Sequence, residues 1–283
     1  MYTRRTALLF SAAFVALFGA LADAPDPGTA AWAATSTPDP GADRAPLRVA
    51  AYNIRHGRGV DDRVDLKRIA EVLRALDADV IALQEVDDRT RRTGGVDQVA
   101  VLAEILGYRG FHGPHRPYQG GFYGNAILTR LPVNAFRTHP IEPASGSALT
   151  VFEVELQRGV SVISVPLART PEERMAQADS VTRSFTELDR PVILAGDLNG
   201  RPGGPVVERL ARDWLVLAKT GDPRTFPAPA PDREIDFILV SAGSRVEVLE
   251  HRVFEEGLAS DHRPILAVLR FPTARIHERR PHG

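Results

Sequence analysis

Short apolar runs that each end in a polar residue recur along this chain, and they constrain its fold more than any other feature. The clearest example is residues 191–202, PVILAGDLNGRP, in which an apolar run is followed by Gly196, Asp197 and Asn199. A run of this length predicts a strand buried on both faces. Its polar residues then lie at the strand's C-terminal edge, where open α/β sheets carry their chemistry. Asp, Asn and Gly are also the commonest turn residues, so an Asx-rich turn is the alternative interpretation.

Four other stretches have the same form. Strands are expected at residues 47–53, 79–84, 123–129 and 235–240, and they carry Asn53, Glu85, Asn125 and Asp236 respectively. A last strand is expected at residues 264–269, directly after Asp261 and His262. The chain therefore places one polar residue or more at the end of each of several buried strands.

Amphipathic segments separate these strands and predict helices. Apolar residues recur at helical spacing in residues 66–76 and 99–106, and Gly107 closes the second segment. A third helix is expected to run from Pro171 to about residue 188, because Thr170, Pro171 and Glu173 form a capping-box sequence. The alternation of strand and helix predicts an α/β domain over residues 47–271.

Two further strands are expected to pair as a hairpin at residues 150–156 and 160–165, and another strand is expected at 246–254. In residues 150–156 apolar and acidic side chains alternate, with Glu153 and Glu155 on one face. This alternation predicts a strand that is half exposed to water.

The N-terminal segment has the features of an export signal. Arg4 and Arg5 precede an apolar run that is shorter than the roughly 20 residues of a spanning helix. The arginine pair favours the twin-arginine route. Residues 1–33 are therefore predicted to be a signal peptide, with an uncleaved membrane anchor as the alternative. Residues 34–46 are expected to be a linker and residues 272–283 a polar tail, and the protein is expected to be secreted or held at the cell envelope.

Composition narrows the class of protein. The chain has no cysteine, so neither disulfides nor a lipoprotein anchor can support it. The formal net charge is −1, and removal of residues 1–33 leaves it unchanged. This balance argues against a protein that grips duplex nucleic acid, because such binding depends on a basic surface. We expect a monomer with no obligate protein partner.

The polar residues at the strand ends together suggest a metal-dependent reaction. Carboxylates packed closely repel one another unless a cation lies among them. Oxygen ligands favour Mg²⁺, Mn²⁺ or Ca²⁺ over zinc. A hard cation beside acids and a histidine suits phosphoester hydrolysis, in which an acid or imidazole manages the proton of the attacking water.

Each residue also has a structural alternative. Taken alone, Asn53 could cap the end of a strand and Glu85 could be a surface acid. Asp236 could form an ion pair with Arg233, and His262 could be a histidine of the core or of a turn. Three arginines follow Glu85, namely Arg89, Arg91 and Arg92. They either bind the negative charge of a substrate or lie in a solvated loop.

Six ordered motifs resemble those of the endonuclease/exonuclease/phosphatase family. They are AYNIRHG at residues 51–57, ALQEVD at 82–87, YGNAILTR at 123–130, AGDLNGRP at 195–202, EIDFILVS at 234–241 and SDHRPILAVL at 260–269. The resemblance spans residues 47 to 271. It implies the DNase I-like fold, a four-layer α/β sandwich in which two packed mixed sheets have helices outside.

The resemblance also implies roles for individual residues. Glu85 is expected to be the principal metal ligand, with Asn53 beside it and Asp261 as a second carboxylate on the metal or phosphate side. Asp197 and Asn199 are expected to orient and deprotonate the attacking water. Asp236 is expected to hold His262, which contacts the scissile phosphate. Asn125 is expected to be a phosphate-contacting amide.

One position departs from the family pattern. The family usually has a histidine within Thr-His-Leu after the strand at residues 160–165, whereas this chain has Pro166. Arg169, His112 and His115 are the nearest candidates to replace it. We therefore expect an exported Mg²⁺-type phosphoester hydrolase that favours diesters. The alternative is a non-catalytic descendant that binds a phosphorylated ligand. A nucleic acid, a phospholipid headgroup and a small phosphorylated metabolite all remain open as the substrate.

Overall fold

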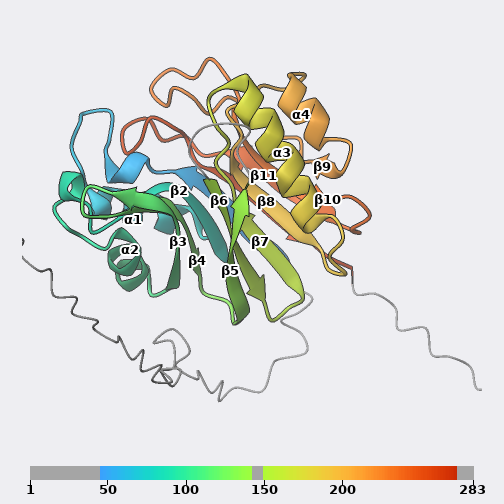
Figure 1. Cartoon of the computed structure of the whole chain (residues 1–283), viewed down its shortest axis with the longest axis horizontal. Helices are drawn as coiled ribbons and strands as arrows, with labels where there is room; N and C mark the ends of the chain where they lie inside the picture. Colours follow the sequence, from blue (N-terminus) through green and yellow to red (C-terminus); the bar gives the residue numbers. More distant parts are fainter. Residues whose placement is uncertain (1–44, 142–148, 273–283) are drawn as a thin grey trace, which may run out of the picture. The chain divides into compact units, whose positions relative to one another are not determined.

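Two six-stranded β-sheets packed face to face form the centre of the protein (Figure 1). The computed structural model describes residues 45–141 and 149–272. The predicted signal peptide lies outside these residues, as do all but two residues of the predicted linker and all but one of the predicted tail. No helix in the described part of the chain is long and apolar enough to cross a membrane.

The first sheet combines strands from both ends of the domain. Its order is β11-β12-β1-β2-β4-β3. The strands are β1 (Leu47–Asn53), β2 (Val80–Asp88), β3 (Arg109–Tyr118), β4 (Gly121–Thr129), β11 (Glu247–Val253) and β12 (Ile265–Arg270). Strands β1 and β2 are parallel and their neighbours are antiparallel, so the sheet is mixed.

The second sheet comes from the middle of the chain. Its order is β5-β6-β7-β8-β10-β9. The strands are β5 (Val133–Ile141), β6 (Leu149–Leu156), β7 (Val160–Ser164), β8 (Val192–Asp197), β9 (Trp214–Val216) and β10 (Asp236–Ser241). The expected hairpin is present as β6 and β7.

Helices cover the outer face of each sheet, which gives four layers. The first sheet carries α1 (Leu66–Leu76) and α2 (Gln98–Leu106), and the second carries α3 (Pro171–Phe185) and α4 (Pro205–Leu210) (Figure 1). Short 3₁₀ turns η2 (Arg55–Gly57) and η3 (Arg91–Thr93) follow β1 and β2. The predicted four-layer α/β sandwich is confirmed.

Both faces of the central strands are apolar because each faces a different core. In β1, Val49 and Ala51 lie between the sheets, whereas Ala50 and Tyr52 pack under the helices. Successive side chains in a strand point to opposite faces, so a strand covered on both sides reads as a continuous apolar run. This is why the buried strands could be predicted from short apolar runs.

Strand β2 does not end before Glu85, as the sequence had suggested. It runs on to Asp88 through a bulge, where the register with β4 shifts between Leu83 and Val86. Glu85 lies at this bulge with a left-handed φ of 57°. A bulge changes the direction in which a side chain points relative to the regular alternation of a strand. The direction of the Glu85 side chain is therefore set by the bulge and not by the end of the strand.

The third helix begins at Pro171 as predicted, but it differs from its prediction at its end and in its capping. It ends at Phe185 and not near residue 188. The capping box does not form, because the Thr170 hydroxyl donates to the Glu173 carboxylate at 2.7 Å and makes no bond to the helix backbone.

The expected exposed face of β6 is wrong for Glu153, whose side chain is buried. Its carboxylate accepts hydrogen bonds from Ser161 Oγ at 2.7 Å and Arg190 Nη2 at 3.1 Å, and it lies 2.8 Å from His139 Nε2. Burial alone would raise the pKa of Glu153, but these three partners lower it from 4.5 to about 2. An alternation of apolar and acidic residues in the sequence therefore does not distinguish a solvent-exposed face from a buried network of ion pairs.

We expect Glu153→Gln to lower the free energy of unfolding by about 1.5–3 kcal/mol at pH 7, since hydrogen bonds to a charged group are lost. The folded-state pKa is depressed, so this stability is present above pH 4.5 and is lost as pH falls towards about 2. Urea unfolding at several pH values measures both effects.

Glu155→Gln is the matched control for this measurement. Glu155 lies two residues along β6 and pairs with Arg137 and Arg190 nearer the surface. An exposed pair of this kind contributes less than about 1 kcal/mol. Equal stability losses in the two variants would contradict a special role for Glu153.

Three strands at or near sheet edges were not predicted. They are β3, β5 and β9, three of the four terminal strands of the two sheets, whereas the fourth, β11, was expected. β3 contains Pro114 and Pro117, which an edge strand tolerates because its outer backbone groups need no partner. The six-residue helix α4 was also missed, since it is too short for periodicity to reveal.

Candidate functional site

The two sheets bring their polar strand ends to one edge. Asn53 at the end of β1 pairs in register with Gln84 of the parallel strand β2. In the second sheet Asp197 at the end of β8 pairs with Asp236 at the start of β10. Since the sheets pack face to face, the ends of β1 and β8 meet, and the predicted strand-end cluster exists.

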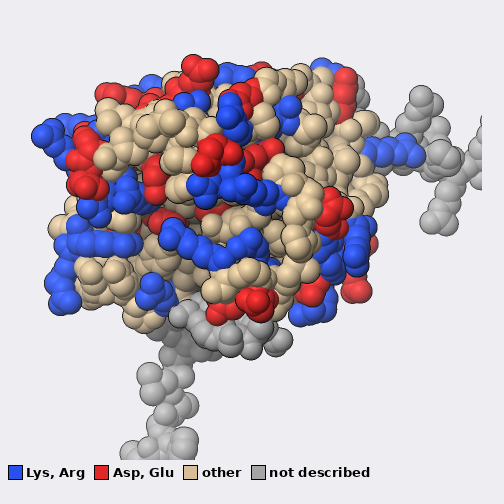
Figure 2. Space-filling model, turned by 90° about the horizontal axis from the view of Figure 1, so that it is seen from above, with Lys and Arg blue, Asp and Glu red and all other residues tan. Residues whose placement is uncertain are grey.

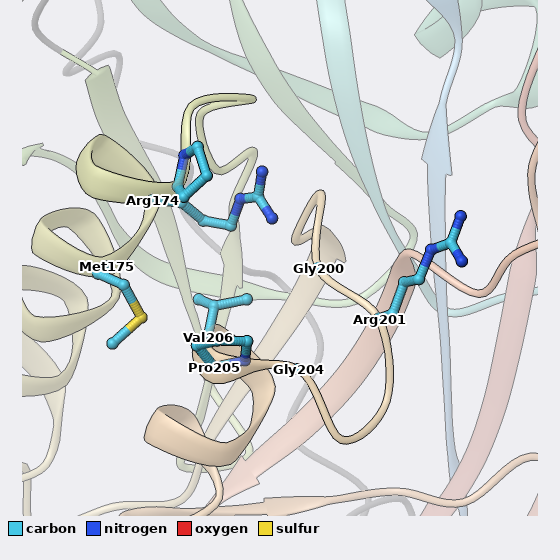
Figure 3. A pocket seen from close by; sticks show the side chains of 8 residues that line it. Arg174, Met175, Gly200, Arg201, Gly204, Pro205 and Val206 are labelled. Carbon is cyan, nitrogen blue, oxygen red and sulfur yellow. The ribbon is translucent and has the colours of Figure 1, made fainter.

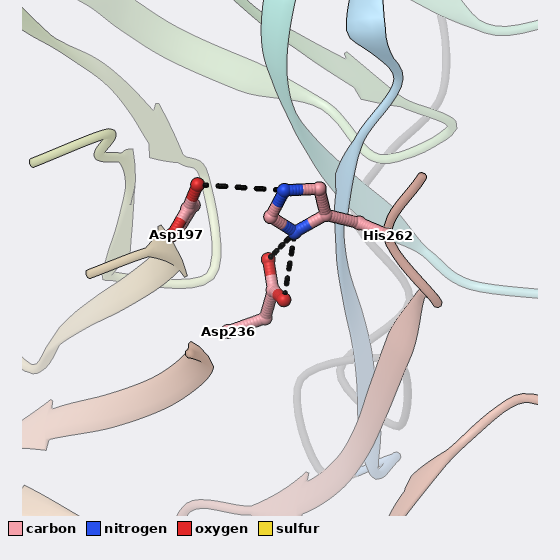
Figure 4. Close-up of side chains that lie close together, drawn as sticks. All are labelled: Asp197, Asp236 and His262. Atoms are coloured by element: carbon pink, nitrogen blue, oxygen red, sulfur yellow. Dashed lines mark hydrogen bonds and ion pairs between the residues drawn. The ribbon is translucent and has the colours of Figure 1, made fainter. Parts of the chain in front are cut away.

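His262 lies between the two aspartates (Figure 4). Its Nδ1 is 3.0 and 3.1 Å from the two carboxylate oxygens of Asp236, and its Nε2 is 3.7 Å from Asp197 Oδ2. All three side chains are at least 95% buried. Asp236 therefore fixes the imidazole and pairs with His262, whereas Arg233 pairs with Asp232 instead.

The close charges shift the acidity of this cluster. Burial lowers the pKa of His262, but the Asp236 and Asp197 carboxylates outweigh it and raise that pKa to about 10. Burial raises the pKa of Asp197 to about 7, against the opposing charge of His262. His262 is thus cationic at neutral pH, and Asp197 is an acid poised to gain or lose a proton.

Asn53 joins this cluster to Glu85. Its Nδ2 donates to Glu85 Oε1 at 3.2 Å and to Asp197 Oδ2 at 3.3 Å, and it lies 3.5 Å from His262 Nε2. Ser260 Oγ donates to the Asn53 carbonyl at 2.7 Å, which ties the loop before β12 to the end of β1. One buried amide therefore bridges both sheets.

Asn199 is held beside Asp197 by a tight turn. Its backbone N–H donates to Asp197 Oδ1 at 2.8 Å, and its Nδ2 donates to the Leu167 carbonyl at 2.8 Å. The turn predicted as the alternative is thus real, and it also orients the carboxylate. Gly196 is required here, because an added Cβ would lie 2.0 Å from the Val165 carbonyl oxygen.

Left-handed backbone occurs at several residues around this cluster. Positive φ angles of 45° to 57° occur at non-glycine residues that flank the cluster, namely Arg55, His56, Glu85 and Asn199. Such conformations cost free energy and gather at functional sites.

Two predicted site residues lie apart from the buried cluster. Asp261 is partly exposed and lies 3.7 Å from Arg55 Nε. Asn125 is completely buried in β4, and its amide donates to the Ser164 carbonyl at 3.0 Å. The roles predicted for them, on the metal or phosphate side for Asp261 and at the phosphate for Asn125, stay predictions.

The arginines after Glu85 divide in two. Arg89 and Arg91 are exposed, and Arg89 pairs with Asp88 and Asp97. Arg92 instead binds the buried Asp87 carboxylate through two hydrogen bonds of 2.7 Å. Two of the three thus form the expected solvated loop, and the third is structural.

Lys219 is a site-supporting residue that the sequence did not indicate. Its ammonium group donates to the Asp236 carbonyl at 2.8 Å, contacts Glu234 at 2.5 Å and is fully buried. Burial lowers its pKa. No motif marks this lysine, and only its tertiary contact with β10 reveals it.

The histidines considered as replacements at Pro166 are both neutral at pH 7. Burial lowers the pKa of His115 to about 4 and also lowers that of His112. His115 Nδ1 accepts a hydrogen bond from the Thr150 backbone at 3.2 Å. Arg169 is exposed on the loop after β7.

A small cavity of about 70 Å³ lies next to Asn199, between α3 and α4 (Figure 3). Gly200 and Arg201 line one side and Arg174 another. Arg174 donates to the carbonyls of Ala168 and Arg169, so it supports the loop that carries Pro166.

Residues 50–262 match the model of the endonuclease/exonuclease/phosphatase family. The chain belongs to this family. Its members are generally phosphoesterases or nucleases and in general depend on a divalent metal.

Individual relatives of the endonuclease/exonuclease/phosphatase family are distant. The uncharacterized protein YbhP of Escherichia coli K12 is 24% identical over 242 residues, which are 78% of this chain and 95% of YbhP. An endonuclease/exonuclease/phosphatase from Beutenbergia cavernae is 26% identical with a TM-score of 0.62, covering 82% of this chain and 74% of that chain. A mannosyl-6-phosphatase of Bacteroides thetaiotaomicron is 19% identical with a TM-score of 0.62, covering 80% and 100%. The fold is of the DNase I-like type.

The donor set fits the divalent cation on which this family depends. Glu85 supplies a carboxylate and Asn53 an amide, and the neighbouring Asp197 and Asp236 carboxylates add negative charge against one cationic histidine. One carboxylate oxygen each of Asp197 and Asp236 and a ring nitrogen of His262 lie within 4.8 Å of one another, which concentrates charge beside Glu85 and Asn53. Hard oxygen donors of this kind suit Mg²⁺ or Mn²⁺.

Proposed function

We propose that this protein is a divalent-metal-dependent phosphoester hydrolase that acts by in-line attack of water on a phosphodiester. The observation that carries the proposal is the buried Asp236–His262–Asp197 arrangement, bridged to Glu85 by Asn53. A solely structural cluster has no need to bury three carboxyl or imidazole groups beside a left-handed glutamate.

Glu85 and Asn53 would hold the cation, with Asp261 as the predicted second carboxylate. When bound, Mg²⁺ neutralises phosphate charge and lowers the pKa of water. Asp197, oriented by Asn199, accepts the proton of the attacking water. His262 is kept cationic by Asp236, and its Nε2–H donates to an oxygen of the phosphoryl group as charge develops there.

The charge balance of the chain gives no support for duplex nucleic acid as the substrate. Figure 2 shows one face on which Lys and Arg groups lie interspersed with Asp and Glu groups. This mixed surface is consistent with the net charge of −1. We propose to test three classes of substrate: single-stranded nucleic acids, phospholipid headgroups and small phosphorylated metabolites.

Turnover of bis(p-nitrophenyl) phosphate with Mg²⁺, and its loss with EDTA, tests the proposed activity. p-Nitrophenyl phosphate in the same assay separates diester from monoester hydrolysis. No turnover of either compound, together with calorimetric binding of inorganic phosphate, would support the alternative of a non-catalytic binding protein.

We also propose that the protein is exported as a monomer through its N-terminal residues 1–33. Mass spectrometry of the mature N-terminus and sedimentation of the purified protein test the two statements. A mature chain that retains Arg4 and Arg5 would contradict removal of the signal.

Glu85→Gln is expected to weaken Mg²⁺ binding roughly 10-fold or more, because loss of a group that fixes a metal commonly costs 10-fold to 100-fold in affinity. The fold should persist, since Glu85 lies at a bulge and outside the apolar cores. Calorimetry with Mg²⁺ and circular dichroism measure the two effects. Glu71→Gln, on the exposed face of α1, is the control, and equal Mg²⁺ affinity in both variants would refute the assignment.

A further inference from the structure

Tyr123 occupies the place across from the loop that carries Pro166. In β4, Ile127 lies in the core between the sheets, and Asn125, two residues earlier on the same face, contacts the Ser164 carbonyl at the end of β7. Tyr123 is the next residue on this face. It therefore lies beyond the last residue of β7 and faces the loop of residues 165–170.

The same position brings Tyr123 close to Glu85. Tyr123 pairs in register with Asp87, two residues after Glu85 in β2, and with Arg116 in β3. Besides burial, the charge of Glu85 raises the pKa of the Tyr123 hydroxyl, and the charge of Arg169 in the loop after β7 lowers it. Tyr123 thus lies between the carboxylate expected to hold the metal and the loop that lacks a histidine.

The Tyr123 ring is firmly held. The guanidinium groups of Arg92 and Arg116 each lie 5.5 Å from its centroid. Tyr118 and His115 contact its edges at centroid distances of 6.4 and 5.9 Å. Since Asp87 fixes Arg92 through two hydrogen bonds, the ring is immobilised from several sides.

The Tyr123 hydroxyl is available to a ligand. Within residues 45–141 and 149–272 it has no hydrogen-bond partner, although the residue as a whole is only partly exposed. It is not among the fully buried polar atoms without partners, so part of its surface stays accessible. Burial of the ring and the charge of Glu85 raise the pKa of Tyr123 well above its ordinary value, so the hydroxyl keeps its proton and can donate it.

We propose that Tyr123 is a catalytic residue whose hydroxyl donates a hydrogen bond to a non-bridging oxygen of the scissile phosphate. It supplies the donor that Pro166 cannot provide, from the opposite side of the site. This inference rests on the proposed phosphoester hydrolase activity. A rigid donor aimed at developing charge acts mainly in the transition state.

Tyr123→Phe removes only the hydroxyl and keeps the ring between its two arginines. We expect kcat for an aryl phosphodiester to fall roughly 10²-fold to 10³-fold, as for loss of one preorganised donor, with little change in KM. The loss should be greater for poor leaving groups. Mg²⁺ affinity and the urea midpoint should stay unchanged.

Tyr118→Phe is the matched control. Tyr118 stacks on the same two arginines, but its hydroxyl already accepts a hydrogen bond from Gln119 at 3.3 Å. Turnover in this variant should stay within about twofold of wild type, because surface and peripheral changes have small effects.

Pro166→His provides a rescue experiment. Added to Tyr123→Phe, it should recover part of the lost kcat, whereas in the wild type it should add little because the donor is already present. If the wild type is active and Tyr123→Phe turns over substrate as fast as Tyr118→Phe, the catalytic role of Tyr123 is wrong. The proposed hydrolase function is not affected by that result. A wild type with no turnover of any phosphoester overturns both.

Discussion

Replacement of Asp197 by asparagine is expected to lower kcat by roughly 10²-fold to 10⁴-fold, the range for loss of a general base. The substitution keeps the size of the side chain and its hydrogen bond with the Asn199 backbone, but it removes the proton acceptor. Burial gives Asp197 a pKa of about 7, close to the pH at which a base works best. KM and the unfolding midpoint should change little.

Asp222→Asn is the control for this loss. Asp222 is exposed and pairs only with Arg224 in the described chain, so its variant should match the wild type. Steady-state kinetics at saturating Mg²⁺ measure both variants. If Asp197→Asn kept the wild-type kcat, the proton would be taken by another group, and the role of β8 in the chemistry would be lost.

Replacement of Asp236 by asparagine should produce a second large loss, on the order of 10²-fold in kcat, because His262 loses the carboxylate that holds its charge. The pH profile gives a sharper test. Asp236 and Asp197 raise the pKa of His262 to about 10, so the cationic donor is present at lower pH and is lost as pH rises through that value. In Asp236→Asn the alkaline limb of kcat should therefore move to lower pH.

The measurement is kcat from pH 6 to 10.5 for wild type and variant with the same metal. The Asp236 carbonyl that accepts from Lys219 is unchanged by the substitution, so β10 should stay in place. Asp232→Asn, four residues earlier and exposed, provides the control profile. An alkaline limb at the same pH in all three proteins would show that Asp236 does not set the charge of His262.

The sequence predicted the centre of the fold better than its borders. Strands such as β1 and β8 are covered on both faces, so local composition alone reports their environment. β3, β5 and β9 form edges. The first two contain proline and polar residues and the third has only three residues, so each is recognisable as a strand only through its pairing with a neighbour. The burial of Glu153 likewise depends on Arg190, 37 residues away in the chain.

In the candidate site, too, features set by local sequence could be predicted, whereas features set by tertiary contacts could not. Asp197, Asp236, His262 and Asn53 were expected to gather because they stand at strand ends, and they do. The bulge at Glu85 and the buried Lys219 were not foreseen, since each arises from tertiary contacts that no short motif records. Tyr123 was part of a recognised motif, yet its place opposite Pro166 emerged only from the register of β4.

Both ends of the folded chain lie away from the chemistry. Leu47 at the start of β1 pairs with Leu269 near the end of β12, while Asn53 and His262 lie at the other end of the same two strands. A strand of seven residues spans about 20 Å. A fusion partner or a resin joined at residue 45 or residue 272 would therefore begin about one strand length from the polar cluster, at the opposite edge of the first sheet.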